Sequence, residues 1–149
     1  MRRILLALAT LLTVFGLAAC GAPSAPSAPT KVNVAGGAYT NVAPAQLKQM
    51  LAAKDFVFVN VHIPYAGEIE KTDAFIPYNE IEQNISKFPA DKNAKIFLYC
   101  QSGRMSAIAA ETLVKLGYTN VWNLDGGMTE VTLVIAWEAA GLPVIQNKK

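Results

Sequence analysis

Apolar residues fall into short runs that alternate with segments of helical periodicity. Three runs have the length and the β-branched and aromatic content of strands: 56–61, 95–100 and 120–124. Four segments are predicted to be helices: one that begins at Pro44, then 78–88, 103–117 and 136–141. Strands that alternate with helices indicate a parallel sheet of about five strands, covered by helices on both faces. The predicted fold class is therefore a three-layer α/β fold.

The amino-terminal segment has the layout of an export signal. Arg2 and Arg3 precede an apolar run at 4–17, which is shorter than the ~20 residues of a membrane-spanning helix. The sequence LAAC, which ends at Cys20, resembles the lipobox of bacterial lipoproteins. Such a resemblance implies that residues 1–19 are a signal peptide and that Cys20 becomes the lipidated first residue. An ordinary signal peptide with a chance cysteine is the alternative.

A low-complexity stretch rich in alanine, proline and serine follows this cysteine. Its composition cannot pack a core and is typical of an extended tether. We therefore assign 20–36 to a tether and 37–149 to one folded domain. The expected location is the extracytoplasmic side of a bacterial cell membrane, where two or more acyl chains suffice for stable anchoring.

Removal of the signal peptide makes the chain electrically balanced. The sequence has 13 basic and 11 acidic residues, and Arg2 and Arg3 account for the whole excess. This balance argues against a nucleic-acid partner, because binding phosphates requires clustered basic residues. Membrane attachment would depend on lipid rather than on a basic patch, and Arg104 becomes the only arginine of the mature chain.

Cys100 follows a buried strand and precedes a helix, and with Cys20 lipidated it is the only free thiol. Sites in parallel sheets lie at this carboxyl end of the strands. The amides of Gln101, Ser102 and Gly103, together with the helix N-terminus, can form a cradle for an anion. Such a cradle favours Cys100 as a thiolate nucleophile. The alternative is a buried structural cysteine, which would not need polar residues in the next four positions.

Residues 99–128, YCQSGRMSAIAAETLVKLGYTNVWNLDGGM, resemble the active-site half of the rhodanese-like sulfurtransferase superfamily. The resemblance implies a single domain of the rhodanese-like fold. It also implies that Cys100 takes sulfane sulfur from a small anionic donor such as thiosulfate. The resulting persulfide would pass sulfur to a thiophilic acceptor, such as cyanide or a thiol, without a cofactor.

Sulfur transfer at Cys100 suggests a role for several of the loop residues that follow it. Arg104 can bind an anionic donor or the leaving sulfite. Ser102 and Ser106 can donate hydroxyls to sulfur or cap the helix. The candidate site residues are Cys100, Gln101, Ser102, Gly103, Arg104, Met105 and Ser106.

The spacing of the loop distinguishes sulfur transfer from phosphate chemistry. Phosphatase and arsenate-reductase relatives on the same fold carry an arginine after five intervening residues, which closes a larger ring around a tetrahedral oxyanion. In this chain that position holds Ser106, and Arg104 comes after only three residues. A site the size of a sulfur atom is therefore predicted.

The chain departs from the family pattern at three places. Asn60-Val61-His62 replaces a common Asp-Val-Arg element, where Asn60 can still hydrogen-bond and His62 could carry charge at mildly acid pH. Met105 stands where many relatives have arginine. An apolar insert at 129–135 is expected to lengthen the last helix, with a short strand or an exposed partner surface as alternatives.

Two classes of function therefore remain open. The first is a sulfurtransferase of the cell envelope that works through a Cys100 persulfide. The second is a lipid-tethered module that binds an unidentified protein partner or senses sulfur species without turnover. No metal site is expected, because one histidine and one free cysteine cannot supply the usual number of ligands.

Overall fold

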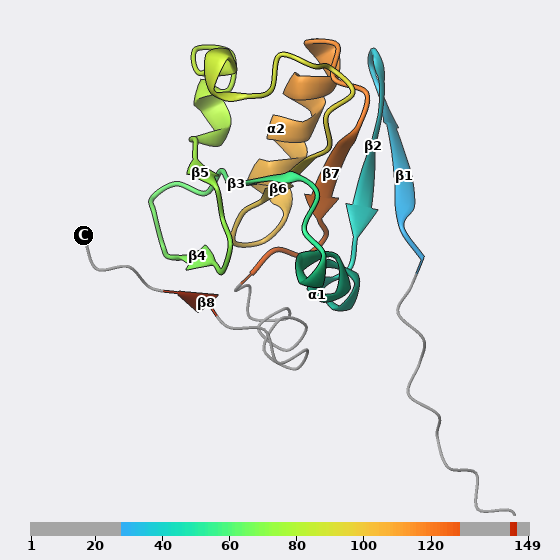
Figure 1. Cartoon of the computed structure of the whole chain (residues 1–149). Coiled ribbons are helices and arrows are strands. Elements are labelled where there is room, and N and C mark those ends of the chain that lie inside the picture. Colours follow the sequence, from blue (N-terminus) through green and yellow to red (C-terminus); the bar gives the residue numbers. More distant parts are fainter. Residues whose placement is uncertain (1–27, 129–143, 146–149) are drawn as a thin grey trace, which may run out of the picture.

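The computed structural model describes residues 28–128 and 144–145. Its centre is a six-stranded sheet in the order β1-β2-β7-β6-β3-β5, in which β1 and β2 are antiparallel and the other neighbours are parallel (Figure 1). The strands are β1 (Thr30–Val34), β2 (Gly37–Val42), β3 (Val57–Asn60), β5 (Ala74–Phe75), β6 (Ile96–Tyr99) and β7 (Val121–Leu124). A separate antiparallel pair joins β4 (Glu68–Ile69) to β8 (Val144–Ile145).

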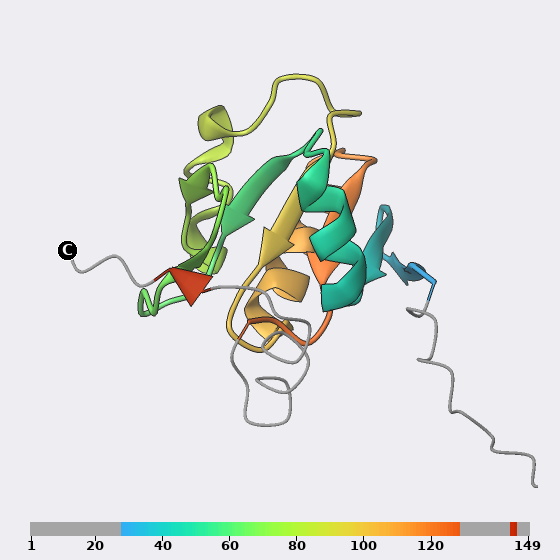
Figure 2. The ribbon, with the colours of Figure 1, turned by 60° about the horizontal axis from the view of Figure 1, so that its bottom comes forward.

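Two α-helices cover opposite faces of the sheet, as Figure 2 shows. Helix α1 (Pro44–Ala52) begins with proline at its first position, and α2 (Arg104–Lys115) follows the cysteine loop. The sheet is thus the middle layer of three, and the prediction of an α/β fold with helices on both faces is confirmed.

The alternation of side chains along β6 divides the core in two. Phe97 and Tyr99 belong to the hydrophobic core cluster that also contains the buried residues of α1. Ile96, Leu98 and Cys100 belong to the cluster under α2. Since successive side chains of a strand point to opposite faces, this run must be apolar on both faces. The same alternation directs Cys100 toward α2.

Both ends of α2 are determined by glycines in the left-handed conformation. Gly103 precedes the helix with φ 86°, and Gly117 follows it with φ 89°. At the carboxyl end, Gly117 N–H donates to the carbonyl of Val114 and Tyr118 N–H to that of Leu113. These two bonds form a Schellman motif, so the predicted end of the helix at Gly117 is confirmed.

The structure corrects the boundary between tether and domain. Residues 30–34, assigned from sequence to a tether at 20–36, form β1 and pair along their whole length with β2. Val32 and Val34 pack against the core under α2. The domain therefore begins by Thr30, because apolar residues at alternate positions complete the edge of the sheet.

The segment 78–88 is not the continuous amphipathic helix that its spacing predicted. It contains two 3-10 helices, η1 (Tyr78–Glu80) and η2 (Ile85–Lys87). The side chain of Asn84 donates to the carbonyl of Glu80, and its backbone has φ −107° and ψ 20°. Since the backbone of Asn84 leaves the helical region, the segment turns between two short helices and does not continue as one.

Several predictions lie outside the described residues. These are the signal peptide at 1–19, the lipidated Cys20, the insert at 129–135 and the helix at 136–141. Among the residues that are described, none forms a helix long and apolar enough to cross a membrane.

Candidate active site

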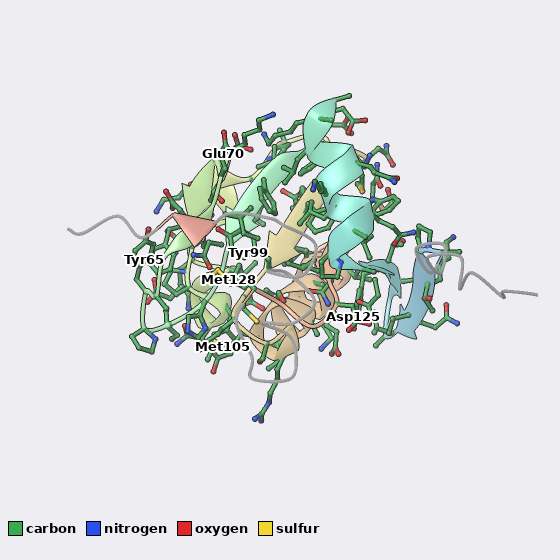
Figure 3. The ribbon with its side chains drawn as sticks, turned by 90° about the horizontal axis from the view of Figure 1, so that it is seen from below. Tyr65, Glu70, Tyr99, Met105, Asp125 and Met128 are labelled. Atoms are coloured by element: carbon green, nitrogen blue, oxygen red, sulfur yellow. The ribbon has the colours of Figure 1, made fainter. Side chains whose placement is uncertain are left out.

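Cys100 lies one residue beyond the end of β6, at the carboxyl edge of the parallel strands. Backbone pairing between the strands continues up to this point: Val61 N–H donates to the carbonyl of Tyr99, with an N···O distance of 2.9 Å. The cysteine residue is only 1% exposed. Figure 3 looks onto this edge and labels Tyr99, Met105 and Met128. Tyr99 and Met128 pack in the cluster on the α1 side of the sheet, and Met105 packs against the cluster under α2.

Two hydrogen-bond donors converge on the Cys100 sulfur. The N–H of Gly103 donates to Sγ with an N···S distance of 3.1 Å. The Ser106 hydroxyl lies 3.4 Å from Sγ and 3.1 Å from the Gly103 carbonyl, so its one hydrogen is shared between them. The Ser106 hydroxyl can turn fully to the sulfur when the sulfur bears a negative charge, because the Gly103 carbonyl keeps its bond from Ala107 N–H.

The start of α2 adds to this arrangement. The first amides of an α-helix have no partner within the helix, and its N-terminus carries partial positive charge. The helix begins at Arg104, directly after the glycine that bonds Sγ. The positive φ of Gly103 allows the tight turn between strand and helix, since residues with a Cβ rarely adopt it. Of the predicted anion cradle, the Gly103 amide and the adjoining helix N-terminus lie at the sulfur.

A second segment, Gly126–Gly127–Met128, supports the loop from behind. A Cβ on Gly127 would lie 2.4 Å from the Gln101 carbonyl, so the two backbones are in direct contact there. A Cβ on Gly103 would lie 2.9 Å from the Gly126 nitrogen. Met128 N–H donates to the Cys100 carbonyl at 3.1 Å. The sequence showed the paired glycines only as part of a resemblance, and the structure gives their steric reason.

The other predicted loop residues differ in exposure. Ser106 is fully buried, whereas Gln101, Ser102 and Met105 are half-buried and Met105 packs against the core under α2. Arg104 is exposed at the start of the helix. The structure therefore places Ser106 against sulfur and leaves Arg104 accessible to a solute anion.

Asn60 organises the loop that follows β3. Its Oδ1 accepts the backbone N–H of His62 at 3.0 Å, and its Nδ2 donates to the Gly67 carbonyl at 2.9 Å. The prediction that Asn60 can still form hydrogen bonds in place of the usual aspartate is confirmed.

His62 lies buried just after β3. The residue is 7% exposed, and its Nδ1 is buried without a hydrogen-bond partner in the described part of the chain. Burial lowers the pKa of His62, because desolvation disfavours the imidazolium. Burial therefore works against the charge that the sequence suggested for His62 at mildly acid pH.

Tyr99 is a site neighbour that the sequence did not single out. Its hydroxyl accepts the N–H of Ile69 at 3.0 Å and shares a hydrogen bond of 2.7 Å with the Thr72 hydroxyl. Burial raises the pKa of Tyr99, so the phenol stays neutral. Since Tyr99 immediately precedes Cys100, it connects the β4 loop to the strand that carries the thiol. A buried tyrosine hydroxyl usually has a partner, but only the fold identifies it.

The arrangement is suited to stabilising negative charge on a sulfur atom. The donors come from backbone and a hydroxyl, and the described residues contain no cluster of metal-ligating side chains. Fold and site together define an α/β domain with a single cysteine loop between a central parallel strand and its following helix.

Comparisons with known proteins agree with that class. The family model of the rhodanese-like domain matches residues 43–133. The thiosulfate sulfurtransferase PspE of Escherichia coli is 33% identical over 84 residues, which cover 56% of this chain and 80% of PspE. A crystal structure of a rhodanese-like domain protein from Staphylococcus aureus superposes with a TM-score of 0.55 at 27% identity, covering 72% of this chain and 98% of that one.

A further relative, an uncharacterized protein of Synechocystis, is 32% identical over 120 residues. The match covers 77% of this chain and 62% of the length of that relative. The chain belongs to the rhodanese-like family.

Proposed function

We propose that this chain is a sulfurtransferase that carries sulfane sulfur as a persulfide on Cys100. The observation that carries the proposal is the convergence of the Gly103 amide and the Ser106 hydroxyl on Sγ. The relationship to PspE, which is named a thiosulfate sulfurtransferase, supports thiosulfate as a donor.

The reaction has two displacement steps. The Cys100 thiolate attacks the outer sulfur of thiosulfate, a sulfur–sulfur bond forms, and sulfite leaves with the electron pair of the bond that breaks. A thiophilic acceptor, such as cyanide or a thiolate, then attacks the terminal sulfur and releases the Cys100 thiolate. Each step moves one sulfur atom without net oxidation. The loop donors stabilise the negative sulfur throughout.

Arg104 has the chemistry to attract the anionic donor. Its guanidinium is exposed at the first position of α2, beside the loop that holds the thiol. A guanidinium binds sulfonate-like oxygens through several charge-assisted hydrogen bonds. Gln101, Ser102 and Met105 would form the remaining rim of the entrance.

The proposal includes export and attachment through lipid on Cys20. The basic start, the apolar run and the sequence LAAC at 17–20 support it. The folded domain would then work outside the cytoplasm, held to a bacterial membrane by acyl chains.

Mass spectrometry of the intact protein after incubation with thiosulfate tests the chemistry. We expect the added mass of one sulfur atom on the wild-type domain, its loss on addition of cyanide, and none on a Cys100→Ser variant. Folding of both proteins is checked by circular dichroism. A folded wild type that never acquires sulfur from thiosulfate or another sulfane donor would instead indicate a non-catalytic binding module.

A further inference from the structure

The point where the chain enters the domain lies at the same edge of the sheet as the cysteine loop. Thr30, the first residue of β1, pairs with Asn41 of β2. Asn41 pairs with Asn123 of β7, and Asn123 in turn pairs with Leu98 of β6. Thr30 is thus level with a residue two positions before Cys100. Figure 1 shows β1 starting at the end to which the arrows of β2 and β7 point.

This strand register gives the position of Cys100 relative to Thr30, where the chain enters the domain. Strands are spaced ~4.8 Å apart, so the three steps from β1 to β6 amount to roughly 14 Å sideways. Two further residues along β6 add about 7 Å in the direction of the carboxyl edge. The turn at residues 35–36, between β1 and β2, lies at the opposite edge because the two strands are antiparallel. Cys100 therefore lies beyond the entry point, on the side away from that turn.

The distance from lipid to domain is short. Ten residue-to-residue steps lead from Cys20 to Thr30, and a chain of this length spans at most ~36 Å when fully extended. If acyl chains hold Cys20, the entry point stays within that distance of the bilayer. The carboxyl edge, where the chain is attached, is then held closer to the membrane on average than the edge with the 35–36 turn.

From this geometry we propose that the Cys100 loop faces the membrane and that its acceptor is a thiol of a second membrane protein, held at the bilayer surface. The inference rests on the proposed function. The acceptor thiol loses its proton to solvent and attacks the terminal sulfur of the Cys100 persulfide. A new sulfur–sulfur bond forms on the acceptor, and Cys100 leaves as the thiolate. Confinement of both partners to one surface raises their effective concentration, which a freely diffusing thiol does not gain.

The test compares two points of attachment on the same full chain. Both proteins carry Cys20→Ser and an enzymatically lipidated peptide tag. One has the tag in place of the natural lipid at residue 20, and the other has it inserted between Ala35 and Gly36. Each is loaded with thiosulfate on vesicles that contain a phospholipid with a thiol headgroup, phosphatidylthioethanol. Mass spectrometry follows sulfur transfer to this lipid and, separately, to the same headgroup thiol free in solution.

We expect attachment at residue 20 to give transfer to the lipid thiol about tenfold or more faster than attachment in the 35–36 turn. Transfer to the soluble thiol should be equal for the two proteins, which also shows that the insertion leaves the site intact. Equal rates to the lipid thiol would overturn the inference. If Cys100 acquires no sulfur, the proposed function itself fails. If the natural chain carries no lipid on Cys20, membrane orientation fails while the sulfur chemistry stands.

Discussion

The Ser106 hydroxyl lies 3.4 Å from the Cys100 sulfur and is shared with the Gly103 carbonyl. A change to Ser106→Ala removes one of two donors to sulfur, while Gly103 keeps its bond from Ala107 N–H. We expect the turnover number for sulfur transfer to fall about three- to tenfold, in line with one hydrogen bond. Steady-state kinetics with thiosulfate and cyanide measure the change.

Thr112→Ala is the matched control for this change. It removes a hydroxyl from the same helix, which donates to the Ile108 carbonyl at 3.0 Å. Its turnover number should equal that of the wild type. A Ser106→Ala protein with unchanged kinetics would mean that the hydroxyl serves only the helix start.

Gly127 packs against the backbone of the cysteine loop. A Cβ there would lie 2.4 Å from the Gln101 carbonyl, at a backbone φ of 67°. Gly127→Ala should therefore displace the loop and abolish most of the activity. The loss in the free energy of unfolding should exceed the loss expected from the left-handed conformation of the backbone alone.

Gly117→Ala separates the cost of the left-handed backbone conformation from the cost of the steric clash with the loop. Gly117 has a similar φ of 89°, but a Cβ there meets nothing within 4 Å. We expect a loss of about 1–2 kcal/mol in the free energy of unfolding with activity retained. Chemical denaturation and kinetics of both variants give the comparison. Equal losses in both would contradict the contact between Gly127 and the loop.

Tyr99→Phe leaves the buried N–H of Ile69 without its acceptor. An unpaired buried polar group costs about 1–3 kcal/mol, and we expect a loss in that range. The Ile69 amide should also exchange with solvent faster, which hydrogen exchange by NMR detects. Tyr118→Phe is the control, because that hydroxyl donates to the Pro89 carbonyl elsewhere in the fold. Unchanged exchange at Ile69 would contradict the connection from β6 to the β4 loop.

The buried His62 predicts a loss of stability in acid. Burial lowers its pKa in the folded protein below the ordinary 6.5, so the unfolded chain binds more protons as pH falls through that value. Its contribution to stability is complete above the unfolded pKa and is lost as pH falls toward the folded pKa. The free energy of unfolding should therefore fall as the pH drops below about 6.5, the ordinary pKa of histidine in the unfolded chain. In His62→Gln the drop should be smaller, and an identical pH dependence would exclude His62 as its source.

Arg104 is expected to act on donor binding rather than on the fold. Because its side chain is exposed at the start of α2, Arg104→Ala should leave the unfolding temperature nearly unchanged. The KM for thiosulfate should rise severalfold, and Arg104→Lys should restore part of the loss. The exposed Lys115 at the other end of α2 provides a control, Lys115→Ala, with an unchanged KM. An equal KM for Arg104→Ala and the wild type would remove Arg104 from the entrance.

The sequence by itself determined those features that depend on local pattern. Buried strands, their alternation with helices and the end of α2 at Gly117 follow from hydrophobic spacing and glycine chemistry. The position of Cys100 between strand and helix was equally local. A resemblance over residues 99–128 then indicated the family, which the match over residues 43–133 shows.

Only the tertiary structure decided how distant segments meet. Val32 and Val34 complete the sheet although they adjoin a tether-like sequence, and Asn84 interrupts a segment whose apolar spacing suits a helix. The contact of Gly127 with the cysteine loop and the bond from Ile69 to Tyr99 join residues 26 and 30 positions apart. Such contacts depend on which strands become neighbours. Hydrophobic periodicity is the same for many strand orders, so this information exists only once the chain has folded.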